Sequence, residues 1–232
     1  MRGSVIAALL LLSACCTAKH TETAPMAASG MNTLSAAEQS AGWRLLFDGR
    51  TTAGWRDFKS DHINPQWQVV DGALTLTAPG GGDIVSVDEY ENFELMLDWK
   101  ISPGGNSGIF FNVVEGDHDT IWRTGPEMQI LDNEAAEDRV NPTHRAGSNY
   151  DLEAPRVVSV HPANEWNSVR LVVNHGHVQQ FLNGELQVEY DLWSPAWEAQ
   201  VARSKFASMP DYGRAHRGHL ALQDHGNVVA FR

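Results

Sequence analysis

A carboxylate and an amide occupy alternate positions in residues 127–132, which read EMQILD. Side chains of a β-strand point to opposite faces in turn, so Glu127 and Gln129 are predicted to share a polar face, while the apolar residues between and beside them enter a core. A carboxylate on such a face can transfer a proton, and an amide can bind an oxygen of a ligand. Asp132 follows with the opposite parity, and we expect it at the strand end as a further ligand contact.

A second segment near the C-terminus, residues 219–226, repeats this arrangement with the sequence HLALQDHG. Its two leucines are predicted to be buried, which leaves Gln223 and His225 for the polar face. Asn106 precedes another apolar strand, predicted at residues 109–114, and could bind the same ligand. We therefore expect Gln223 to share one concave surface with the polar residues of the first segment.

Two polar loops carry further candidates. Residues 134–151 form a long polar excursion that contains His144 and Tyr150, and loops of this length are uncommon unless they serve a function. We expect this loop at the rim of the concave surface, where His144 and Tyr150 could take part in proton transfer. Trp122 lies in the preceding polar loop, and its ring could stack on the face of a sugar.

Short strands must hold these residues in place. Residues 67–77 are typical of a hairpin that turns at Asp71 and Gly72, and apolar and polar side chains alternate over residues 93–101. One helical patch is predicted, within residues 193–212, and no sustained helical period or internal repeat occurs elsewhere. Many short strands separated by turn signals predict an all-β fold, built as a two-sheet sandwich.

The composition limits the classes of partner and the chemistry of the cysteines. The chain has 232 residues, of which 42% are hydrophobic, so one domain with a sizeable core is expected. Its 17 basic and 29 acidic residues give a net charge of −12, which argues against nucleic acid as a partner because nucleic-acid binders present a basic face. Cys15 and Cys16 are the only cysteines, so the folded domain cannot hold a disulfide.

The N-terminus predicts export. Arg2 precedes an apolar run, residues 5–12, which is too short to span a bilayer and is typical of a secretory signal. The sequence Leu-Ser-Ala before Cys15 matches a bacterial lipoprotein signal, so we expect Cys15 to be lipidated and to become the mature N-terminus. An ordinary signal peptide ending near Ala18 is the alternative.

This assignment divides the chain into a lipoprotein signal peptide at residues 1–14, a flexible tether at residues 15–41 and a domain at residues 42–232. Ser35 and Glu38 could form a capping box and start a short helix within the tether. The chain is expected in the bacterial cell envelope, in the periplasm or on the outer membrane, with the lipid as its only attachment to a membrane.

Six short segments occur in the order found in one known family. They are residues 46–49 with Gly54 and Trp55, residues 106–110, residues 125–132, residues 165–167, residues 182–184 and residues 218–226. Together they resemble the 3-keto-disaccharide hydrolase family, formerly a domain of unknown function. The resemblance implies a concanavalin A-like jelly-roll β-sandwich with few short helices, an exported protein, and action on sugars oxidised at C3.

Two features of this chain depart from the family pattern. Family members usually have an aromatic or aliphatic residue where this chain has Asn149, next to Tyr150. They also usually continue beyond the position of Arg232 into one more strand segment. We therefore expect a shortened last strand and a weakened sheet edge.

The resemblance also implies a reaction. A ketone at C3 acidifies the hydrogen on C2, so that a base can remove it; the group on C1 then leaves by elimination, and addition of water would complete a net hydrolysis. Glu127 or His144 could be the base, and His225 or Tyr150 the acid. Groups that could stabilise the enolate oxygen are Gln129, Asn106, Lys100 or a divalent cation. The sequence requires no cofactor and identifies no metal.

Two other functions are open to the same residues. A conventional glycosidase such as an endo-glucanase needs two carboxyl groups flanking the scissile bond, and Glu127 is the only carboxylate predicted on a strand face with a second polar group. A non-catalytic carbohydrate-binding module needs only exposed aromatic and amide side chains, and the same sandwich serves as a lectin scaffold. The expected partner in each case is a small oligosaccharide or glycoside.

Overall fold

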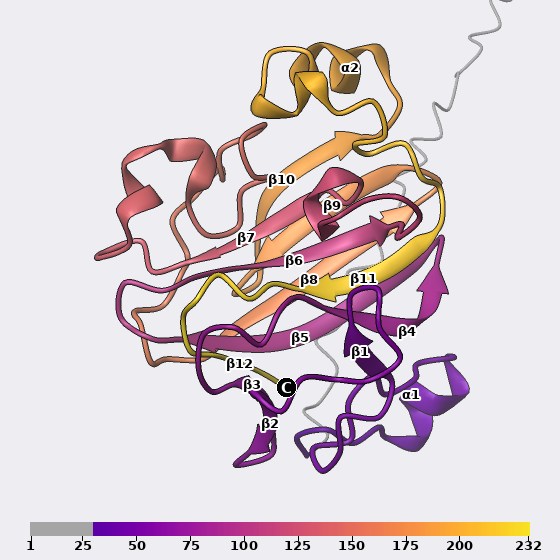
Figure 1. The fold of residues 1–232 in the computed structure, drawn as a ribbon, viewed down its shortest axis with the longest axis vertical. Helices are drawn as coiled ribbons and strands as arrows, with labels where there is room; N and C mark the ends of the chain where they lie inside the picture. The colour runs from indigo at the N-terminus through magenta and orange to yellow at the C-terminus, as the bar shows by residue number, and fades with distance from the viewer. Residues whose placement is uncertain (1–29) are drawn as a thin grey trace, which may run out of the picture.

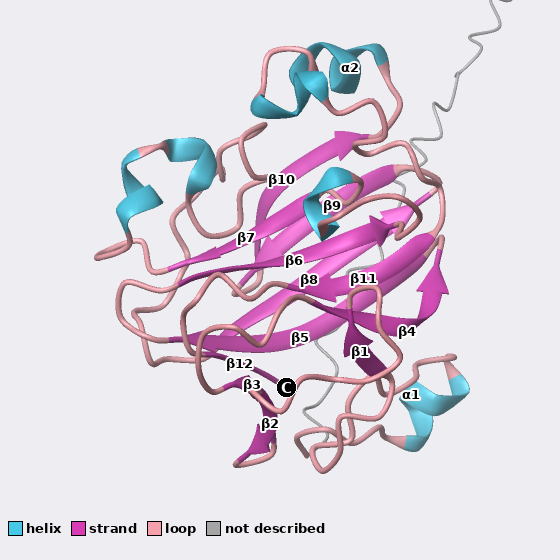
Figure 2. Cartoon of the chain, in the orientation of Figure 1, coloured by secondary structure: helices cyan, strands magenta, loops and turns pink. Residues whose placement is uncertain are grey.

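The computed structural model describes residues 30–232, whose strands form two antiparallel sheets that pack face to face (Figure 1). Most of the regular secondary structure in the described chain is strand, and the few helices are short and peripheral (Figure 2). The all-β two-sheet sandwich predicted from the sequence is confirmed. The predicted signal peptide, Cys15 and most of the predicted tether lie outside the described residues.

The two sheets differ in size. The smaller sheet has the strand order β1 (Trp55–Asp57), β4 (Ile84–Tyr90), β11 (Gly218–Leu222), β6 (Asn106–Val113) and β7 (Glu127–Leu131). The larger sheet has the order β10 (Glu185–Asp191), β9 (His177–Leu182), β8 (Asn167–Asn174), β5 (Phe93–Ile101), β12 (Val229–Phe231), β3 (Ala73–Leu76) and β2 (Trp67–Val70).

The core lies between the sheets and follows from the alternation of apolar residues. On β5, Leu95 and Trp99 are buried whereas Met96 is exposed. Ile109 of β6 and Met128 of β7 belong to the same buried cluster. Each large apolar side chain that is fully buried stabilises the fold by roughly 1.5–3 kcal/mol, so the inward residues fix which face of each strand is left for a ligand.

The last strand is interior to its sheet. β12 pairs with β5 on one side and with β3 on the other. Val229 and Phe231 are buried in the core, and this apolar content explains why the strand inserts between two neighbours. The expectation that the last strand forms a weakened edge is therefore wrong.

The helices are short and capped. In α1 (Ala36–Ser40) the Ser35 side chain accepts from the Glu38 N–H and the Glu38 carboxylate accepts from the Ser35 N–H, so the predicted capping box is present. The predicted helical patch contains α2 (Pro195–Val201) and the 3₁₀ turn η4 (Lys205–Ser208). Within residues 30–232, no helix is both long and apolar enough to cross a membrane.

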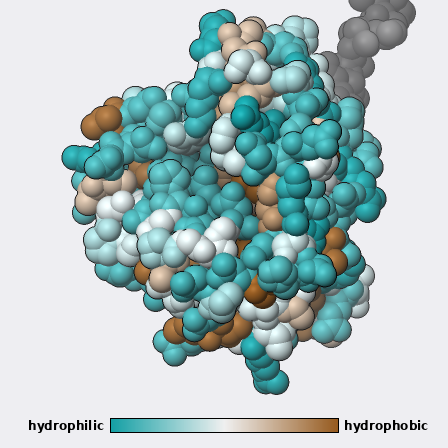
Figure 3. Space-filling view, viewed as in Figure 1, coloured by the Kyte–Doolittle hydropathy of each residue, from teal (hydrophilic) through white to brown (hydrophobic). Residues whose placement is uncertain are grey.

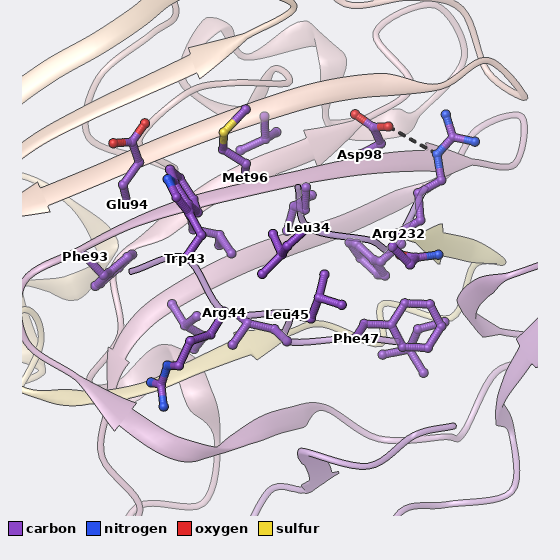
Figure 4. A pocket seen from close by; sticks show the side chains of 18 of the residues that line it. Leu34, Trp43, Arg44, Leu45, Phe47, Phe93, Glu94, Met96, Asp98 and Arg232 are labelled. Atoms are coloured by element: carbon purple, nitrogen blue, oxygen red, sulfur yellow. Dashed lines mark hydrogen bonds and ion pairs between the residues drawn. The ribbon is translucent and has the colours of Figure 1, made fainter. Parts of the chain in front are cut away.

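The part of the predicted tether that the structure describes, residues 30–41, packs against the domain. Asn32 donates a hydrogen bond of 2.8 Å to the carbonyl of Gly72, in the turn between β2 and β3. A cavity of about 820 Å³ lies between this N-terminal segment and β5, and Trp43 and Leu45 extend into it (Figure 4). Its lining contains none of the residues predicted to bind a ligand.

Candidate active site

The outer face of the five-stranded sheet is hollowed near its centre (Figure 3). A small apolar cluster from three adjacent strands, Val85, Phe110 and Ala221, forms part of its floor. The surrounding loops carry the 3₁₀ turns η1 (Ile121–Arg123), η2 (Glu137–Val140) and η3 (Pro142–His144) in addition to η4. A face that is apolar at its centre and polar around it is typical of a ligand site.

Three residues line up across adjacent strands of this face. Leu222 pairs with Ile109 and Gly108 pairs with Gln129, so Gln223, Gly108 and Gln129 follow one another across β11, β6 and β7. The N–H of Gln223 donates to the carbonyl of Gly108 at 3.1 Å. The structure therefore brings the two predicted glutamines to one surface, on either side of a glycine.

The Glu127 side chain lies over that glycine. A Cβ added at Gly108 would overlap the Glu127 carboxyl oxygen and lie 2.9 Å from its Cδ. Gly108 thus leaves the space that the carboxyl group occupies between Gln223 and Gln129. Glu127 pairs with Phe110 two residues along the ladder, and the Phe110 ring also borders the carboxyl group, at 2.8 Å from the same added Cβ.

The environment of Glu127 favours its neutral form. The residue is 5% exposed, and no residue in the range 30–232 donates a hydrogen bond to its carboxyl group. Burial is the largest cause that raises its pKa, to about 8; the negative charges of Asp83 and Asp138 raise it further, and the positive charge of Lys205 opposes them. At neutral pH the group is mostly protonated and can exchange a proton with a ligand.

Two amides and a loop carboxylate extend the polar floor. Gln129 Nε2 donates to Asn106 Oδ1 at 3.3 Å, and Asn106 Nδ2 donates to Asp138 Oδ2 at 3.3 Å. Gln129 Oε1 and Gln223 Oε1 are buried without a hydrogen-bond partner among the described residues. Buried polar groups are rarely left unpaired, so these amides indicate a place for a polar ligand.

The loop with His144 forms a compact cluster at the rim. The His144 ring stacks on Tyr150 at 4.3 Å between centroids, and its Nε2 lies 3.1 Å from Asp151 Oδ1. Asp151 also accepts from the N–H of Lys205 at 2.8 Å, and Lys205 Nζ lies 4.0 Å from the centre of the Tyr150 ring. His144 therefore orders Tyr150 and Asp151, while its Nδ1 has no hydrogen-bond partner among the described residues and lies 3.6 Å from Asp138 Oδ1.

Tyr150 retains its proton. Burial and the nearby Asp138 carboxylate raise its pKa well above the ordinary value, and its hydroxyl donates to Asp138 Oδ2 at 3.4 Å. A phenol with a raised pKa suits the donation of a hydrogen bond more than the transfer of a proton.

Two predicted ligand residues have structural roles elsewhere. Lys100 is on β5, in the other sheet, and its Nζ lies 4.9 Å from the Trp166 ring. The prediction that Lys100 stabilises an enolate in this site does not fit that placement. Asp132 ends β7 as expected, but its carboxylate accepts from the N–H groups of Gly104 and Glu134 at 2.7 and 3.0 Å, so it fixes the turn.

The remaining two predicted residues lie at the periphery. Trp122 is in η1, where it packs against the apolar cluster of the face and lies under Arg123 at 4.9 Å. His225 is exposed in the turn after β11, and nothing in the described chain directs its ring to the Glu127 carboxyl group. Trp122 can therefore border the hollow, while His225 is poorly placed to act as the acid.

Sequence reasoning missed Asp83, Asp138 and Lys205, each of which affects the charge on Glu127. Asp138 and Lys205 belong to loops, for which strand alternation gives no orientation. Asp83 could have been found, because it shares the parity of Val85 at the start of β4. Among residues 30–232, no group of three or more His, Cys, Asp and Glu side chains is arranged to hold a metal ion.

Residues 42–232 match the family model described as a 3-keto-alpha-glucoside-1,2-lyase-like domain. The chain belongs to this family. A protein of Bacteroides thetaiotaomicron named 3-keto-disaccharide hydrolase is 32% identical over an alignment that covers 88% of this chain and 81% of that protein.

Solved structures agree with the family assignment. A proposed glycosyl hydrolase from Parabacteroides distasonis is 34% identical, with a TM-score of 0.81 over 86% of this chain and 95% of the other. A second proposed glycosyl hydrolase from the same organism is 28% identical, with a TM-score of 0.59 over 77% and 95% of the two chains. These likenesses support a glycosidase-like activity for the 3-keto-alpha-glucoside-1,2-lyase-like domain of this chain.

Proposed function

We propose that this chain cleaves the glycosidic bond of 3-keto-glycosides by removing the hydrogen on C2 and eliminating the group on C1. The observation that carries the proposal is the buried Glu127 carboxyl group, which faces a hollow lined by unpaired amides and has a pKa of about 8. A group whose pKa lies near the working pH is suited to acid–base catalysis. The names of the family and of its Bacteroides relative point to the same class of substrate.

The ketone of the substrate explains how side chains that are only weak acids and bases can break a glycosidic bond. With a carbonyl at C3, the carbanion formed at C2 is an enolate, and its charge resides largely on oxygen. Amide N–H groups can stabilise such an oxygen, and Gln129 and Gln223 each have an end without a partner among the described residues. Rotation of the Gln223 amide, whose side chain makes no hydrogen bond within the described chain, would present an N–H group to the hollow.

Residues at the rim of the hollow can bind the sugar and hold this side of the hollow in place. Tyr150 can donate a hydrogen bond to a sugar hydroxyl while it keeps its own proton, and Trp122 can border the sugar with its ring. The cluster of His144, Asp151 and Lys205 holds this side of the hollow in place. The expected partner is therefore a small glycoside, bound on the outer face of the five-stranded sheet.

The test compares an aryl 3-keto-glucoside with the matching unoxidised glucoside, each with and without a chelator. We expect cleavage of the oxidised substrate alone, and deuterium at C2 of the product in deuterated water if water adds back. Equal cleavage of both substrates without label at C2 would instead indicate a conventional glycosidase. Binding of the sugar without cleavage of either substrate would indicate a lectin-like module.

We also propose that the protein is held in the bacterial cell envelope by a lipid on Cys15. The support is the sequence before Cys15, in which small residues follow a short apolar run. Labelling with a fatty-acid analogue should be lost in Cys15→Ala and retained in Cys16→Ala. Labelling that persists in Cys15→Ala would contradict this attachment.

A further inference from the structure

Asp83 continues the row of polar residues on the outer face of the five-stranded sheet. Ile84 pairs with Leu222, so one further step places Asp83 opposite Gln223, and its parity is that of Val85, which faces outward. The row across β4, β11, β6 and β7 is thus Asp83, Gln223, Gly108 and Gln129. The Glu127 carboxyl group lies over Gly108 in this row.

The backbone around Asp83 is held firmly. The N–H of Asp224 donates to Asp83 Oδ1 at 3.0 Å. In turn, Asp224 Oδ2 accepts from the N–H groups of Gly80 and Gly82, both at 3.0 Å. The glycine loop before Asp83 is therefore fixed by an internal carboxylate, and Asp83 Oδ2 is left for another partner.

We propose that Asp83 is the base that takes the C2 hydrogen and that Glu127 is the acid that protonates the leaving oxygen. This assignment rests on the function proposed above. Asp83 and the glycine beneath the Glu127 carboxyl group are two strand spacings apart, about 9–10 Å between their backbones. Both groups therefore lie on the same face of the sheet, with Gln223 on the strand between Asp83 and Gly108.

The charges of the two groups agree with these roles. Burial raises the pKa of Asp83 to about 6, the Asp224 N–H lowers it and the negative charge of Asp224 raises it. The charge of Asp83 raises the pKa of Glu127. Glu127 does not raise the pKa of Asp83 in return, because Glu127 is still neutral when Asp83 ionises. Near pH 7 the main state therefore has an ionised Asp83 and a protonated Glu127, as a base and an acid require.

The reaction balances with these two groups. The C2–H bond breaks, its proton passes to the Asp83 carboxylate, and the electron pair forms the enolate. The enolate then forms a double bond between C1 and C2 as the C1–O bond breaks, and the leaving oxygen takes the proton of Glu127. If water adds back, its hydroxyl bonds to C1, its proton returns to the Glu127 carboxylate, and Asp83 returns a proton to C2.

Deprotonation can be measured without cleavage by using a 3-keto sugar that lacks a leaving group, 3-keto-1,5-anhydroglucitol. In deuterated water, nuclear magnetic resonance follows exchange of its C2 hydrogen. We expect Asp83→Asn to slow exchange by about 10²–10⁴, the usual contribution of a general base. Glu127→Gln should keep the exchange rate within about tenfold of the unchanged protein. The opposite pattern would overturn the assignment.

The dependence of the cleavage rate on the leaving group gives a second test. Glu127→Gln should reduce the rate of cleavage about 10²-fold or more with a 3-keto-disaccharide. With a nitrophenyl 3-keto-glucoside the reduction should be less than about tenfold, because nitrophenolate leaves without a proton. Asp83→Asn should be impaired with both substrates. Circular dichroism and melting temperature verify folding, and Asp83→Glu should recover part of the activity of Asp83→Asn if a carboxylate is what matters.

The outcomes separate this inference from the proposed function. Cleavage of 3-keto-glycosides that survives Asp83→Asn within tenfold would overturn the role of Asp83 and leave the function intact. A lack of C2 exchange and of keto-specific cleavage in the unchanged protein would instead overturn the function itself, and the assignment of Asp83 with it.

Discussion

Gly108 on β6 is the residue over which the Glu127 carboxyl group of β7 lies. The Glu127 carboxyl group can take this position because Gly108 has no side chain, since an added Cβ would overlap the carboxyl oxygen. The backbone of Gly108 does not adopt a positive φ angle, so alanine is compatible with its conformation. The requirement for glycine at this position is one of space in the site.

Gly108→Ala should therefore reduce kcat by about 10²-fold or more by displacing the Glu127 carboxyl group, because positioned acid–base groups contribute 10²–10⁴-fold. The fold should be retained, as judged by circular dichroism. Gly30→Ala is the control, because its added Cβ meets only Thr33 Oγ1 at 3.5 Å. Full activity of Gly108→Ala would show that the position of the Glu127 carboxyl group is unimportant.

Glu127 should make the protein less stable as pH rises. Its folded pKa, about 8, exceeds the ordinary value of 4.5, so the folded state holds one more proton than the unfolded chain between these values. The stabilisation is complete below pH 4.5 and is lost as pH rises towards 8. Between pH 6 and 8, above the pKa of Asp83, the free energy of unfolding of Glu127→Gln should increase by about 1.4 kcal/mol per pH unit relative to that of the unchanged protein.

Urea unfolding at several pH values measures this difference. Glu134→Gln serves as the control, because Glu134 is exposed and should show no such trend. Parallel stability curves for Glu127→Gln and the unchanged protein would mean that Glu127 titrates as an ordinary carboxyl group.

Lys205 should set the alkaline end of the pH profile. Its positive charge lowers the pKa of Glu127, so Lys205→Met should raise that pKa and shift the activity change near pH 8 to higher pH. The matched control is Arg203→Met, which removes an exposed charge from the same segment. A profile of kcat against pH tests the effect, and identical profiles for all three proteins would contradict it.

Substitution of Gln129 should change the kinetic constants, whereas substitution of Lys100 should not. Gln129 lies in the hollow, with an unpaired amide oxygen, so Gln129→Met should raise KM or lower kcat by roughly tenfold, equivalent to about 1.4 kcal/mol. Lys100 lies on the other sheet beside Trp166, and Lys100→Met should leave both constants unchanged within error. Steady-state kinetics of the two variants tests the separation.

The sandwich and part of the hollow could be predicted because they depend on local alternation. Burial of Met128 and Ile130 necessarily turns Glu127 and Gln129 outward, and this is visible within five residues of sequence. Lys100 was misplaced because alternation gives the face of a strand but not the sheet to which the strand belongs. That choice depends on long-range pairing, such as that of β5 with β8 and β12.

The roles of the loop residues could not be predicted for a different reason. His144 is ordered by Asp151, and Lys205 reaches the same cluster from a segment more than fifty residues later, through a backbone bond to Asp151. Such contacts have no periodic signature. The pKa of Glu127 depends on burial and on three distant charges, none of which its sequence neighbours reveal.

The described chain begins beside the larger sheet. Arg232, which pairs with Asp98 of β5 at 3.1 Å, also donates to Met31 Sδ at 2.6 Å, whereas Glu127 looks out from the smaller sheet. A lipid attached upstream of Met31 would therefore join the domain on the side of the larger sheet rather than at the hollow. Such an attachment point would leave the entrance of the hollow uncovered by the anchor.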